Sequence, residues 1–404
     1  MLEYFQALEK IKENAPPPKI KLLPLYQAMN RILAKDLYSR SILPSFDNSA
    51  VDGYAIRLLA KDLEQRAGGL KRKETLKLKL QGEIPAGANF KEILKSGHAV
   101  RVYTGASVPL GTQTVVMQEN TERLNGHVVL LESPKLKENI RFRGEDVKRG
   151  ELLLKKGTPL RPVHLALLAS CGYAQVPIFS PPAISILVTG DELVPPGTKL
   201  KPGKIHDSNS ILLEALIQDM GASVCKMYRV GDNKAKIQER IRENLKSDVL
   251  IISGGVSVGD YDFVKEVLKE EGVKEIFWKV NIKPGKPLFF GKRRGALVFG
   301  LPGNPVSVYI TFQEFVRPVL MKMLGRNHKE EWREGRLTQS YRNGHRWHFV
   351  RVLCDAGRKY FRITPLKRQG SHMVGSLAKA NAILRLSPHQ GLKRNQCVSV
   401  KMME

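Results

Sequence analysis

Residues 179–326 alternate two hydrophobic patterns. Short apolar runs, ISILV, DVLII and ALVFG, have the length and composition of buried strands, and each is followed by a loop rich in Gly or Pro. Between these runs, SNSILLEALIQDMGA and DFVKEVLKEEG carry apolar residues at helical spacing, which in the first segment are Leu212, Leu213, Leu216, Ile217 and Met220. Strands that alternate with amphipathic helices predict a doubly wound α/β domain.

The chain on either side of this domain shows the pattern of short strands. Residues 44–143 contain apolar runs separated by Gly and Pro, among them GYAIRL, AVRVYT, TVVMQE and HVVLLE, which predict a small inserted β domain. Residues 327–404 return to the same pattern and predict a C-terminal β-barrel-like domain. Residues 1–43 and 144–178 combine helical patterns with a turn-rich return, so we expect one discontinuous helical/β linker domain. The predicted fold class is multidomain, α/β plus β.

Composition changes this picture in one respect, the net charge. The 404 residues carry a formal charge of +27, while the hydrophobic fraction of 42% is ordinary for a globular protein. The lysines are spread along the chain and alternate with apolar residues in stretches such as LKRKETLKLKL, as in a strand with one solvated face. A basic field attracts small anionic substrates as well as nucleic acids, so charge alone decides neither. The dispersed lysines disfavour a nucleic-acid groove.

Cysteine spacing and hydropathy exclude several classes of protein. The four cysteines, Cys171, Cys225, Cys354 and Cys397, lie far apart without a CxxC pair, which argues against a zinc module and a disulfide framework. No apolar run reaches the roughly 18 residues of a membrane span. The acids in the N-terminal amphipathic segment differ from a secretory signal. We therefore expect a cytoplasmic protein without membrane contact.

The loops that follow the predicted strands hold the candidate chemistry. SGGVSVGD follows DVLII, and a loop so poor in side chains lets an anion approach the backbone amides at a helix start. Asp260 and Asp262 begin that helix, where acids serve as N-caps or, beside an anion, as ligands of Mg²⁺. TGDEL adds Glu192 after another strand, where a surface turn is the simpler explanation. Because the carboxyl ends of parallel strands meet at one edge, Glu192 and Asp262 form a divided candidate metal site.

Two proline-rich turns add cations and a helix start. KPGKP presents Lys283 and Lys286 from a turn that its prolines stiffen, although a solvated turn explains an arbitrary pair of lysines equally well. LPGNP sets Asn304 and Pro305 at the beginning of a long helix, where proline is common. Both turns follow strand-like runs of the α/β segment, so we expect them near the same edge.

Polar residues of the two β segments have ordinary explanations when taken singly. Asp52 and Thr104 lie in SFDNSAVDGYAIR and RVYTGASVP, where most such residues form turns. Arg351 and Ser371 lie in a basic C-terminal stretch that is typical of a solvated face. No Ser-His-Asp order and no HExxH spacing occurs in the sequence, which disfavours a hydrolase triad or a zincin.

In their order, these motifs resemble those of one family. The strings DNSAVDGYAIR, RVYTGASVPLGTQTVVMQE, IRFRGEDVKRGE, ILVTGDEL, DSNSILLEAL, SGGVSVGDYDF, IKPGKPLFFG and GLPGNPVSVYITF run from residue 47 to 313, with a further match through QGSHMVGSLAKANAILRL. Together they are similar to the molybdopterin molybdenumtransferase family, which includes MoeA and the E domain of gephyrin. The resemblance covers nearly the whole chain and implies an elongated homodimer of four-domain subunits. It also implies that residues 179–326 form a MogA-like, molybdopterin-binding α/β domain.

The resemblance further implies an activity and the residues that perform it. Members insert molybdenum from molybdate into the dithiolene of adenylylated molybdopterin and release AMP in a step that needs a divalent cation, here expected to be Mg²⁺ on Glu192 and Asp262. By position in the motifs, catalytic roles fall on Asp52, Thr104, Asp146, Glu192, Asp262, Lys283 and Lys286. Substrate-binding roles fall on Ser253, Gly254, Gly255, Ser257, Asp207, Asn209, Pro302, Gly303, Asn304, Arg351 and Ser371. Asp52, Thr104 and Asp146 are expected to reach the cleft of the other subunit.

Some alternatives stay open at this point. One departure from the family pattern is His206 in KIHDSNS, where Tyr is more usual. The same motifs also suit a molybdopterin adenylyltransferase that acts through the shared α/β domain, or a non-catalytic scaffold of the gephyrin kind. A MogA-type adenylyltransferase is a candidate partner. The sequence does not distinguish molybdate from tungstate, because the two oxyanions share charge and geometry.

Overall fold

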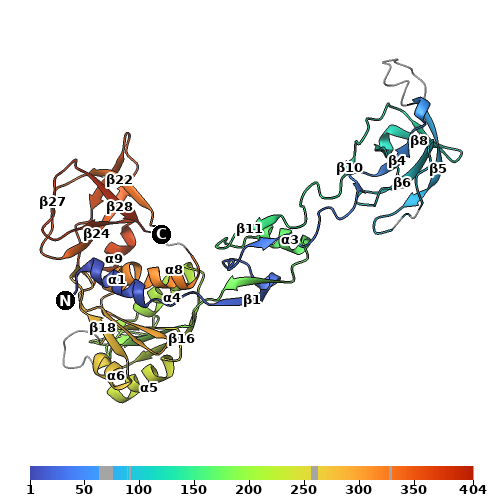
Figure 1. The fold of residues 1–404 in the computed structure, drawn as a ribbon. Helices are drawn as coiled ribbons and strands as arrows, with labels where there is room; N and C mark the ends of the chain where they lie inside the picture. The colour runs from blue at the N-terminus through green and yellow to red at the C-terminus, as the bar shows by residue number, and fades with distance from the viewer. Residues whose placement is uncertain (63–75, 89, 91, 256–262, 327–329, 404) are drawn as a thin grey trace. The chain divides into compact units, whose positions relative to one another are not determined.

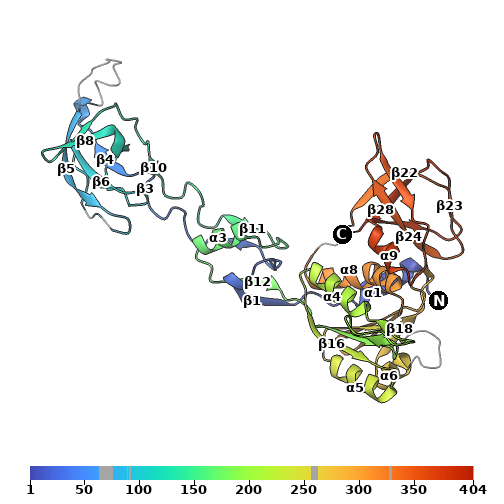
Figure 2. The same ribbon diagram turned by 180° about the vertical axis from the view of Figure 1, so that it is seen from behind.

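The structure is a computed structural model that describes residues 1–62, 76–88, 90, 92–255, 263–326 and 330–403. The chain divides into two compact units, both visible in Figures 1 and 2. The first unit comprises Met1–Leu23, Asn30–Ala34 and Pro177–Glu404, and the second comprises Pro24–Met29 and Lys35–Val176. Domain boundaries within these units remain a prediction. Within the described ranges, no helix combines the length and the apolar character that crossing a membrane requires.

A six-stranded mixed sheet forms the centre of the first unit. Its strand order is β16-β13-β17-β21-β20-β18, in which the first four strands are parallel and β20 runs antiparallel to both of its neighbours, β21 and β18. Every residue of β13 and β17 is buried, as expected of strands covered on both faces. The strands span β13 (Ile184–Thr189), β16 (Val224–Val230), β17 (Val249–Ser253), β18 (Lys274–Trp278), β20 (Phe289–Arg293) and β21 (Ala296–Leu301).

Helices cover both faces of this sheet, which confirms the predicted doubly wound α/β fold (Figure 1). On one face, Ile237 and Val267 pack against Leu187 and Leu250 of the sheet. On the other, four helices bury their apolar sides against Ile186 and its neighbours. The first face carries α5 (Lys234–Asn244) and α6 (Val264–Glu270), and the second carries α1 (Tyr4–Asn14), α4 (Asn209–Asp219), α7 (Pro305–Thr311) and α8 (Arg317–Met323).

Two of these helices differ from the sequence-based expectation. Helix α1 was grouped with the linker segment 1–43, but Tyr4, Ala7 and Ile11 are buried in the core of the α/β layer. The long helix expected after LPGNP is interrupted by a π-helical turn, η3 (Phe312–Val316), before α8 begins. Pro318 lies in the first turn of α8 and lacks the N–H that a continuous α-helix requires.

The C-terminal part of the first unit is a closed five-stranded barrel, as predicted. Its strand order is β24-β25-β22-β28-β26, and the pairing of β24 with β26 closes it. The strand β19 (Ile282–Lys283), from the KPGKP segment, pairs with β24 and so joins the α/β layer to the barrel. The remaining elements are β22 (Trp332–Leu337), β23 (Tyr341–Arg342), β24 (Trp347–Asp355), β25 (Phe361–Pro365), α9 (Val374–Lys379), β26 (Ala382–Leu386), β27 (Gly391–Leu392) and β28 (Cys397–Met402).

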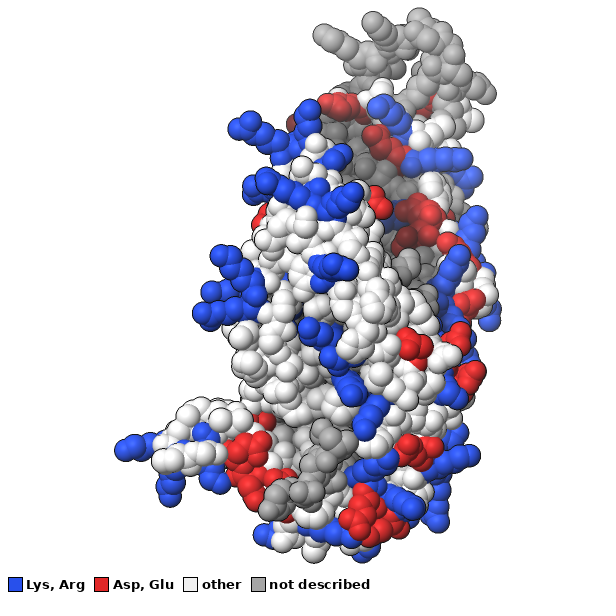
Figure 3. Space-filling model, turned by 90° about the vertical axis from the view of Figure 1, so that its left-hand side faces the viewer, with Lys and Arg blue, Asp and Glu red and all other residues white. Residues whose placement is uncertain are grey.

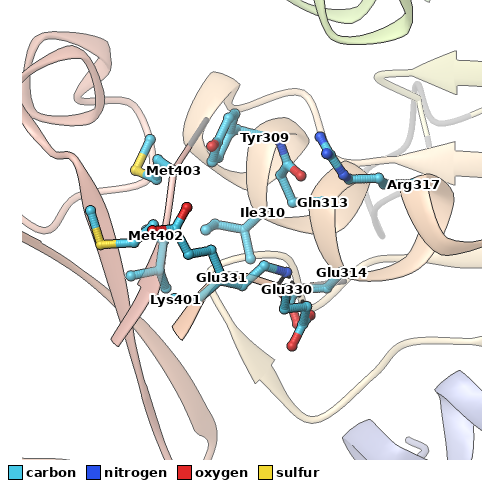
Figure 4. A pocket seen from close by; sticks show the side chains of 11 residues that line it. Tyr309, Ile310, Gln313, Glu314, Arg317, Glu330, Glu331, Lys401, Met402 and Met403 are labelled. Atoms are coloured by element: carbon cyan, nitrogen blue, oxygen red, sulfur yellow. Dashed lines mark hydrogen bonds and ion pairs between the residues drawn. The ribbon is translucent and has the colours of Figure 1, made fainter. Parts of the chain in front are cut away.

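A buried polar chain links helix α1, the π-helical turn and the barrel. The amine of Lys401 donates to Glu314 Oε1 at 2.9 Å and to Glu330 Oε1 at 2.8 Å. Tyr4 donates its hydroxyl proton to the other oxygen of Glu314, and burial raises the pKa of that phenol. Figure 4 shows Lys401 extending from the barrel toward these two carboxylates. The chain therefore fixes the barrel against the α/β layer.

The second unit contains a six-stranded sheet built from the strand-like runs of residues 44–143. Its order is β7-β4-β6-β5-β9-β8, in which only the β5–β6 pair is parallel among the described residues. The strands span β4 (Gly53–Arg57), β5 (Leu76–Ile84), β6 (His98–Val102), β7 (Thr114–Met117), β8 (Thr121–Leu124) and β9 (His127–Leu130). Smaller elements are η1 (Leu25–Gln27), β2 (Leu37–Tyr38), β3 (Asn48–Ser49), η2 (Gln118–Asn120), β10 (Ile140–Arg141), β11 (Leu152–Leu154) and α3 (Pro162–Ser170).

Two of the four boundaries between the units along the chain fall within one short pair of strands. Strand β1 (Ile20–Pro24) pairs with β12 (Gln175–Phe179), and each strand contains a unit boundary. In the second unit, β2 pairs with β11 and β3 pairs with β10. These two-stranded pairs and α3 account for the turn-rich linker that the sequence predicted.

Candidate functional site

The main candidate site is a pocket at the carboxyl ends of three parallel strands of the first unit. The cavity measures about 520 Å³ and lies where β13, β17 and β21 give way to loops. This edge is the usual ligand position in a doubly wound sheet. Of the residues proposed from the sequence, those that line the pocket are Glu192, Asp207, Asn209, Ser253, Gly254, Gly255, Pro302, Gly303 and Asn304.

Two glycines after β17 form the floor of the pocket. Gly254 has φ +95° and Gly255 has φ +64°, a region that side chains rarely adopt. A Cβ atom on Gly254 would lie 2.5 Å from the carbonyl oxygen of Thr189, so the close approach also requires glycine. The bare backbone leaves room for an anionic group beside the strand ends. Ser257 and Asp262, which follow in the same motif, lie outside the described residues.

Asn209, at the start of α4, holds the neighbouring loops together. Its Nδ2 donates to the Oγ of Ser253 at 3.0 Å and to the carbonyl oxygen of Gly303 at 2.7 Å. The Oδ1 atom of Asn209 and the hydroxyl of Thr189 are buried, and within the described ranges neither has a hydrogen-bond partner. Buried polar atoms are normally paired, so both need a partner that the described residues do not supply.

Asp207 lines the pocket but acts as a support. Its fully buried carboxylate accepts hydrogen bonds from the backbone N–H and hydroxyl of Ser210 in the first turn of α4. Arg229 on β16 donates to it through Nε at 2.9 Å. These bonds fix the start of α4, and with it the position of Asn209. His206, just before it, has Nε2 2.8 Å from the carbonyl oxygen of Thr198.

Of the two predicted metal ligands, the structure describes Glu192. Glu192 is exposed at the pocket, and in the described part of the chain its carboxylate has no ion-pair partner. A carboxylate that faces a pocket is a suitable ligand for Mg²⁺, which prefers oxygen donors. The described residues alone contain no group of three His, Cys, Asp or Glu side chains that could hold a metal ion. Asp262, the expected second ligand, is not among them.

The lysines of KPGKP are exposed near the joint between sheet and barrel. Lys283 belongs to β19 and pairs with His348 of β24, while Lys286 lies in the following turn. A Cβ atom on Gly285, which has φ +111°, would lie 2.6 Å from Thr311 of α7. The turn is thus packed closely against α7, although neither lysine lines the pocket itself.

Arg351 is a buried guanidinium in the barrel. It donates through Nε to Ser376, and through Nη2 to the carbonyl oxygens of Arg368 at 2.9 Å and Gly370 at 3.1 Å. Among the described residues, its Nη1 has no partner and no carboxylate pairs with it. Burial lowers the pKa of this guanidinium. Because Arg351 is not on a solvated face, that simpler interpretation of the sequence does not hold.

A cationic environment surrounds His348, the neighbour of Arg351 on β24. Burial, followed by the charges of Lys283, Arg351 and Arg346, lowers the pKa of His348 to about 4. The imidazole is therefore neutral at pH 7 among three cations. Such a concentration of positive charge without a described acid favours an anion close by.

The loop braced by Arg351 reaches the pocket. The carbonyl oxygen of Ser371 accepts a hydrogen bond from the backbone N–H of Val306 in α7, at 3.1 Å. The next residue, His372, lines the pocket beside Asn304 and Pro305. The barrel therefore contributes one wall of the site, and Ser371 lies next to that wall.

The second unit brings two of its three predicted residues together. Asp52 Oδ1 accepts hydrogen bonds from the backbone N–H of Thr104 at 2.7 Å and from its hydroxyl at 2.8 Å. These two bonds hold the pKa of Asp52 below its usual value. Asp146 is exposed elsewhere in this unit, where its N–H donates to the carbonyl oxygen of Leu43.

Comparison with known proteins assigns the chain to a family. The molybdopterin molybdenumtransferase of Haemophilus influenzae is 39% identical over 402 residues, which cover 97% of this chain and 96% of the relative. The chain belongs to the molybdopterin molybdenumtransferase family. The transferase of the same name from Bacillus subtilis is 34% identical over 90% of this chain and 84% of its own length.

Matches to individual domains and to solved structures agree with membership of this transferase family. Residues 2–172 match the MoeA N-terminal region (domain I and II), 185–322 match a probable molybdopterin binding domain, and 334–402 match the MoeA C-terminal region (domain IV). A crystal structure of the molybdopterin biosynthesis MoeA protein from Pyrococcus horikoshii has a TM-score of 0.82 and 31% identity. It covers 100% of this chain and 99% of its own.

Several pocket residues of this family member were not found from the sequence. Thr189 is the last residue of β13 and Asp232 follows β16, so the same strand-end argument could have included them. Pro287 lies at the end of KPGKP, beside residues that were proposed. His372 had no local signal, because its place in the pocket depends on how the barrel packs against α7.

The basic side chains of this family member are not concentrated at the candidate site. Figure 3 shows Lys and Arg side chains spread over one face of the molecule, with Asp and Glu interspersed. Such a distribution gives a diffuse attraction for anions and agrees with the alternating lysines of the sequence.

Proposed function

We propose that this chain inserts molybdenum from molybdate into adenylylated molybdopterin and releases AMP. The observation that carries the proposal is the pocket at the ends of β13, β17 and β21, lined by nine motif residues on a chain that matches a molybdopterin molybdenumtransferase over nearly its whole length. Tungstate is an alternative oxyanion, because it has the same charge and shape.

The pocket would bind the nucleotide-linked substrate through backbone and orphan polar groups. The N–H groups of Gly255 and Asn304 can donate to phosphate oxygens, whereas the N–H of Gly254 is bonded to the carbonyl oxygen of Leu301 at 3.2 Å. Asn209 Oδ1 and the Thr189 hydroxyl, both buried without a described partner, can bind donor groups of the ligand. These contacts would hold the phosphoanhydride in place while it is cleaved.

We further propose that Mg²⁺ binds at Glu192 together with Asp262. When bound, the ion would neutralise charge on the phosphate oxygens. The support for this is the exposed carboxylate of Glu192 in the pocket wall. Molybdate, a dianion, would be bound by Lys283, Lys286, Arg351 and Ser371. The support is the guanidinium of Arg351, whose Nη1 has no hydrogen-bond partner among the described residues.

The site would be completed in a homodimer, in which Asp52, Thr104 and Asp146 reach the pocket of a second copy. Support comes from large apolar side chains that are exposed in the second unit, among them Tyr26 at 79% and Val163 at 69%. Exposed apolar surface of this kind is typical of interfaces. The proposed setting is the cytoplasm, where a MogA-type adenylyltransferase would supply the substrate.

The test is AMP release by purified protein that is given adenylylated molybdopterin, molybdate and Mg²⁺. We expect AMP release to depend on molybdate and Mg²⁺, and to fall at least tenfold in Glu192→Gln and Lys286→Ala, because each removes a charge expected at the reacting groups. Lys226→Ala, an exposed lysine on β16, is the matched control and should retain activity. In a separate reaction with ATP and molybdopterin, release of pyrophosphate with formation of the adenylylated pterin would indicate an adenylyltransferase instead, and binding without turnover would indicate a scaffold.

A further inference from the structure

A second cavity lies on the barrel, apart from the pocket described above. It also measures about 520 Å³ and is formed by the turn between β24 and β25, residues 334–336 of β22 and the first residues of β25 and β28. We call it the barrel groove. Its lining residues are Glu334, Gly335, Arg336, Ala356, Gly357, Arg358, Lys359, Tyr360, Phe361 and Cys397. None of them was proposed from the sequence or belongs to the pocket at the strand ends.

Positive charge dominates the barrel groove. Arg336, Arg358 and Lys359 supply three cations, all exposed, against the single acid Glu334. Within the described ranges, no carboxylate lies at ion-pair distance from any of the three cations. Elsewhere on the surface, Lys234 is paired with both Glu266 and Glu270. An unpaired set in a concave site is suited to an anion with more than one charge.

Aromatic rings give the barrel groove a second kind of surface. Tyr360 is 50% exposed, and the Arg336 guanidinium stacks 4.6 Å from the centroid of its ring. Arg336 is also fixed by a hydrogen bond from Nη1 to the carbonyl oxygen of Asn395, at 3.2 Å. Phe361 lines the groove with Arg333 stacked 5.1 Å from its ring centroid. Planar rings and fixed guanidinium groups provide stacking surfaces for a planar ligand.

The turn that closes one side of the barrel groove has little freedom to change. The N–H of Gly357 donates to the carbonyl oxygen of Tyr360 at 3.1 Å. A Cβ atom on Gly357 would lie 2.4 Å from that oxygen, so the tight turn depends on glycine. The turn carries Arg358, Lys359 and Tyr360, all of which line the cavity.

We propose that the barrel groove binds a nucleotide, with its phosphates on Arg336, Arg358 and Lys359 and its base stacked against the Tyr360 and Arg336 surface. The volume is within the range of about 300–1,000 Å³ that is usual for small-molecule sites. Two phosphates match the excess of three cations over one acid better than a neutral ligand does. The groove is a site of its own, so this proposal does not depend on the activity proposed above.

Cys397 provides a local probe for the test. Its thiol is exposed in the barrel groove, whereas Cys225 is exposed on β16 and serves as an internal control, and the other two cysteines are buried. The full chain is treated with iodoacetamide, and alkylation of each thiol is followed by peptide mass spectrometry. The added ligands are ADP, pyrophosphate, adenosine or a single-stranded oligonucleotide, in separate reactions.

We expect ADP at ten times its dissociation constant to slow alkylation of Cys397 about tenfold, by mass action, and to leave Cys225 unchanged. Pyrophosphate and adenosine should protect more weakly. Arg336→Ala and Lys359→Ala should each abolish protection, and Lys359→Ala lies on an exposed turn where folding is not at risk. Arg342→Ala, an exposed arginine on β23, is the matched control. Equal protection by pyrophosphate, protection only by the oligonucleotide, or no protection would each overturn the proposal.

Discussion

At the scale of residues, the pocket depends on backbone that only glycine supplies. Gly254 combines φ +95° with a 2.5 Å approach to Thr189, whereas Gly197 has φ +86° and open space around its Cβ position. Replacing Gly197 would impose only the energetic cost of an unfavourable φ, whereas replacing Gly254 would add a steric clash of the new Cβ atom. The sequence indicated a loop poor in side chains, but it could not distinguish these two causes.

We expect Gly254→Ala to lower the free energy of unfolding by more than Gly197→Ala, which should cost about 1 kcal/mol for conformation alone. The added cost reflects the shift of β13 or of the loop that a Cβ atom would force. AMP release should be lost in Gly254→Ala and retained in Gly197→Ala. Urea unfolding and the AMP assay measure both quantities, and equal behaviour of the two variants would show that the collision is relieved at no cost.

A second residue-scale prediction concerns pH. The folded-state pKa of His348 is about 4, below the usual 6.5, so the unfolded state binds a proton first as pH falls. Stability contributed by the neutral imidazole is present above pH 6.5 and is lost progressively between pH 6.5 and 4. The loss should total about 3 kcal/mol. Between pH 7 and 4, the free energy of unfolding should change less with pH in His348→Gln than in the native chain. An identical pH dependence of the two proteins would contradict the assignment.

The role of a residue could be predicted from the sequence where the residue lies at the carboxyl end of a parallel strand. Roles that depend on tertiary packing could be predicted less well. Glu192 lines the pocket because parallel strands present their carboxyl ends together, whereas Asn209, named through the family resemblance, lies at the start of α4. Asp207 is different, since its carboxylate is occupied by Ser210 and Arg229. The burial of Arg351 arises from closure of the barrel by β24 and β26, a pairing between distant residues that local patterns do not reveal.

At the scale of elements, the joint between η3, α1 and the barrel determines where the barrel wall of the pocket lies. Lys401 is 13% exposed and Glu314 is 4% exposed as side chains, so this is a nearly buried ion pair. Removing one partner of such a pair leaves an uncompensated buried charge. This joint was not predicted from the sequence, in which residues 305–324 have the pattern of one continuous helix through Glu314.

We expect Lys401→Met to lower the free energy of unfolding by about 3 kcal/mol. The double variant Lys401→Met with Glu314→Gln should recover part of that loss, because the buried charge is removed as well. Chemical denaturation of the native chain, both single variants and the double variant gives the coupling. Purely additive effects would show that the two side chains do not stabilise the joint together.

At the scale of the whole molecule, the sequence predicted the kinds of layers more reliably than the connections between them. The doubly wound sheet, the second unit's sheet and the C-terminal barrel all follow from short-range hydrophobic patterns. The packing of α1 on the α/β layer does not, since an amphipathic helix carries no information about which distant surface it covers. The same limit applies to His372, which reaches the pocket only through the barrel's packing on α7.

If sites are completed by a second copy, complementary defects should rescue each other. Asp52→Asn and Lys286→Ala would each be inactive alone, because every site in either dimer lacks one group. Mixed and re-equilibrated in equal amounts, half the dimers would be heterodimers with one intact site, so activity should return to about a quarter of the native value. Absence of recovery, with dimer exchange verified by a mass-tagged subunit, would contradict the shared site.

The central claim is that the pocket supports metal insertion, and molybdenum content of the pterin product tests it most directly. Purified protein is incubated with adenylylated molybdopterin, Mg²⁺ and molybdate, the pterin fraction is isolated, and molybdenum is measured by mass spectrometry. We expect molybdenum in the pterin product in proportion to the AMP released, with neither product in Glu192→Gln. AMP release without molybdenum in the pterin would contradict the account.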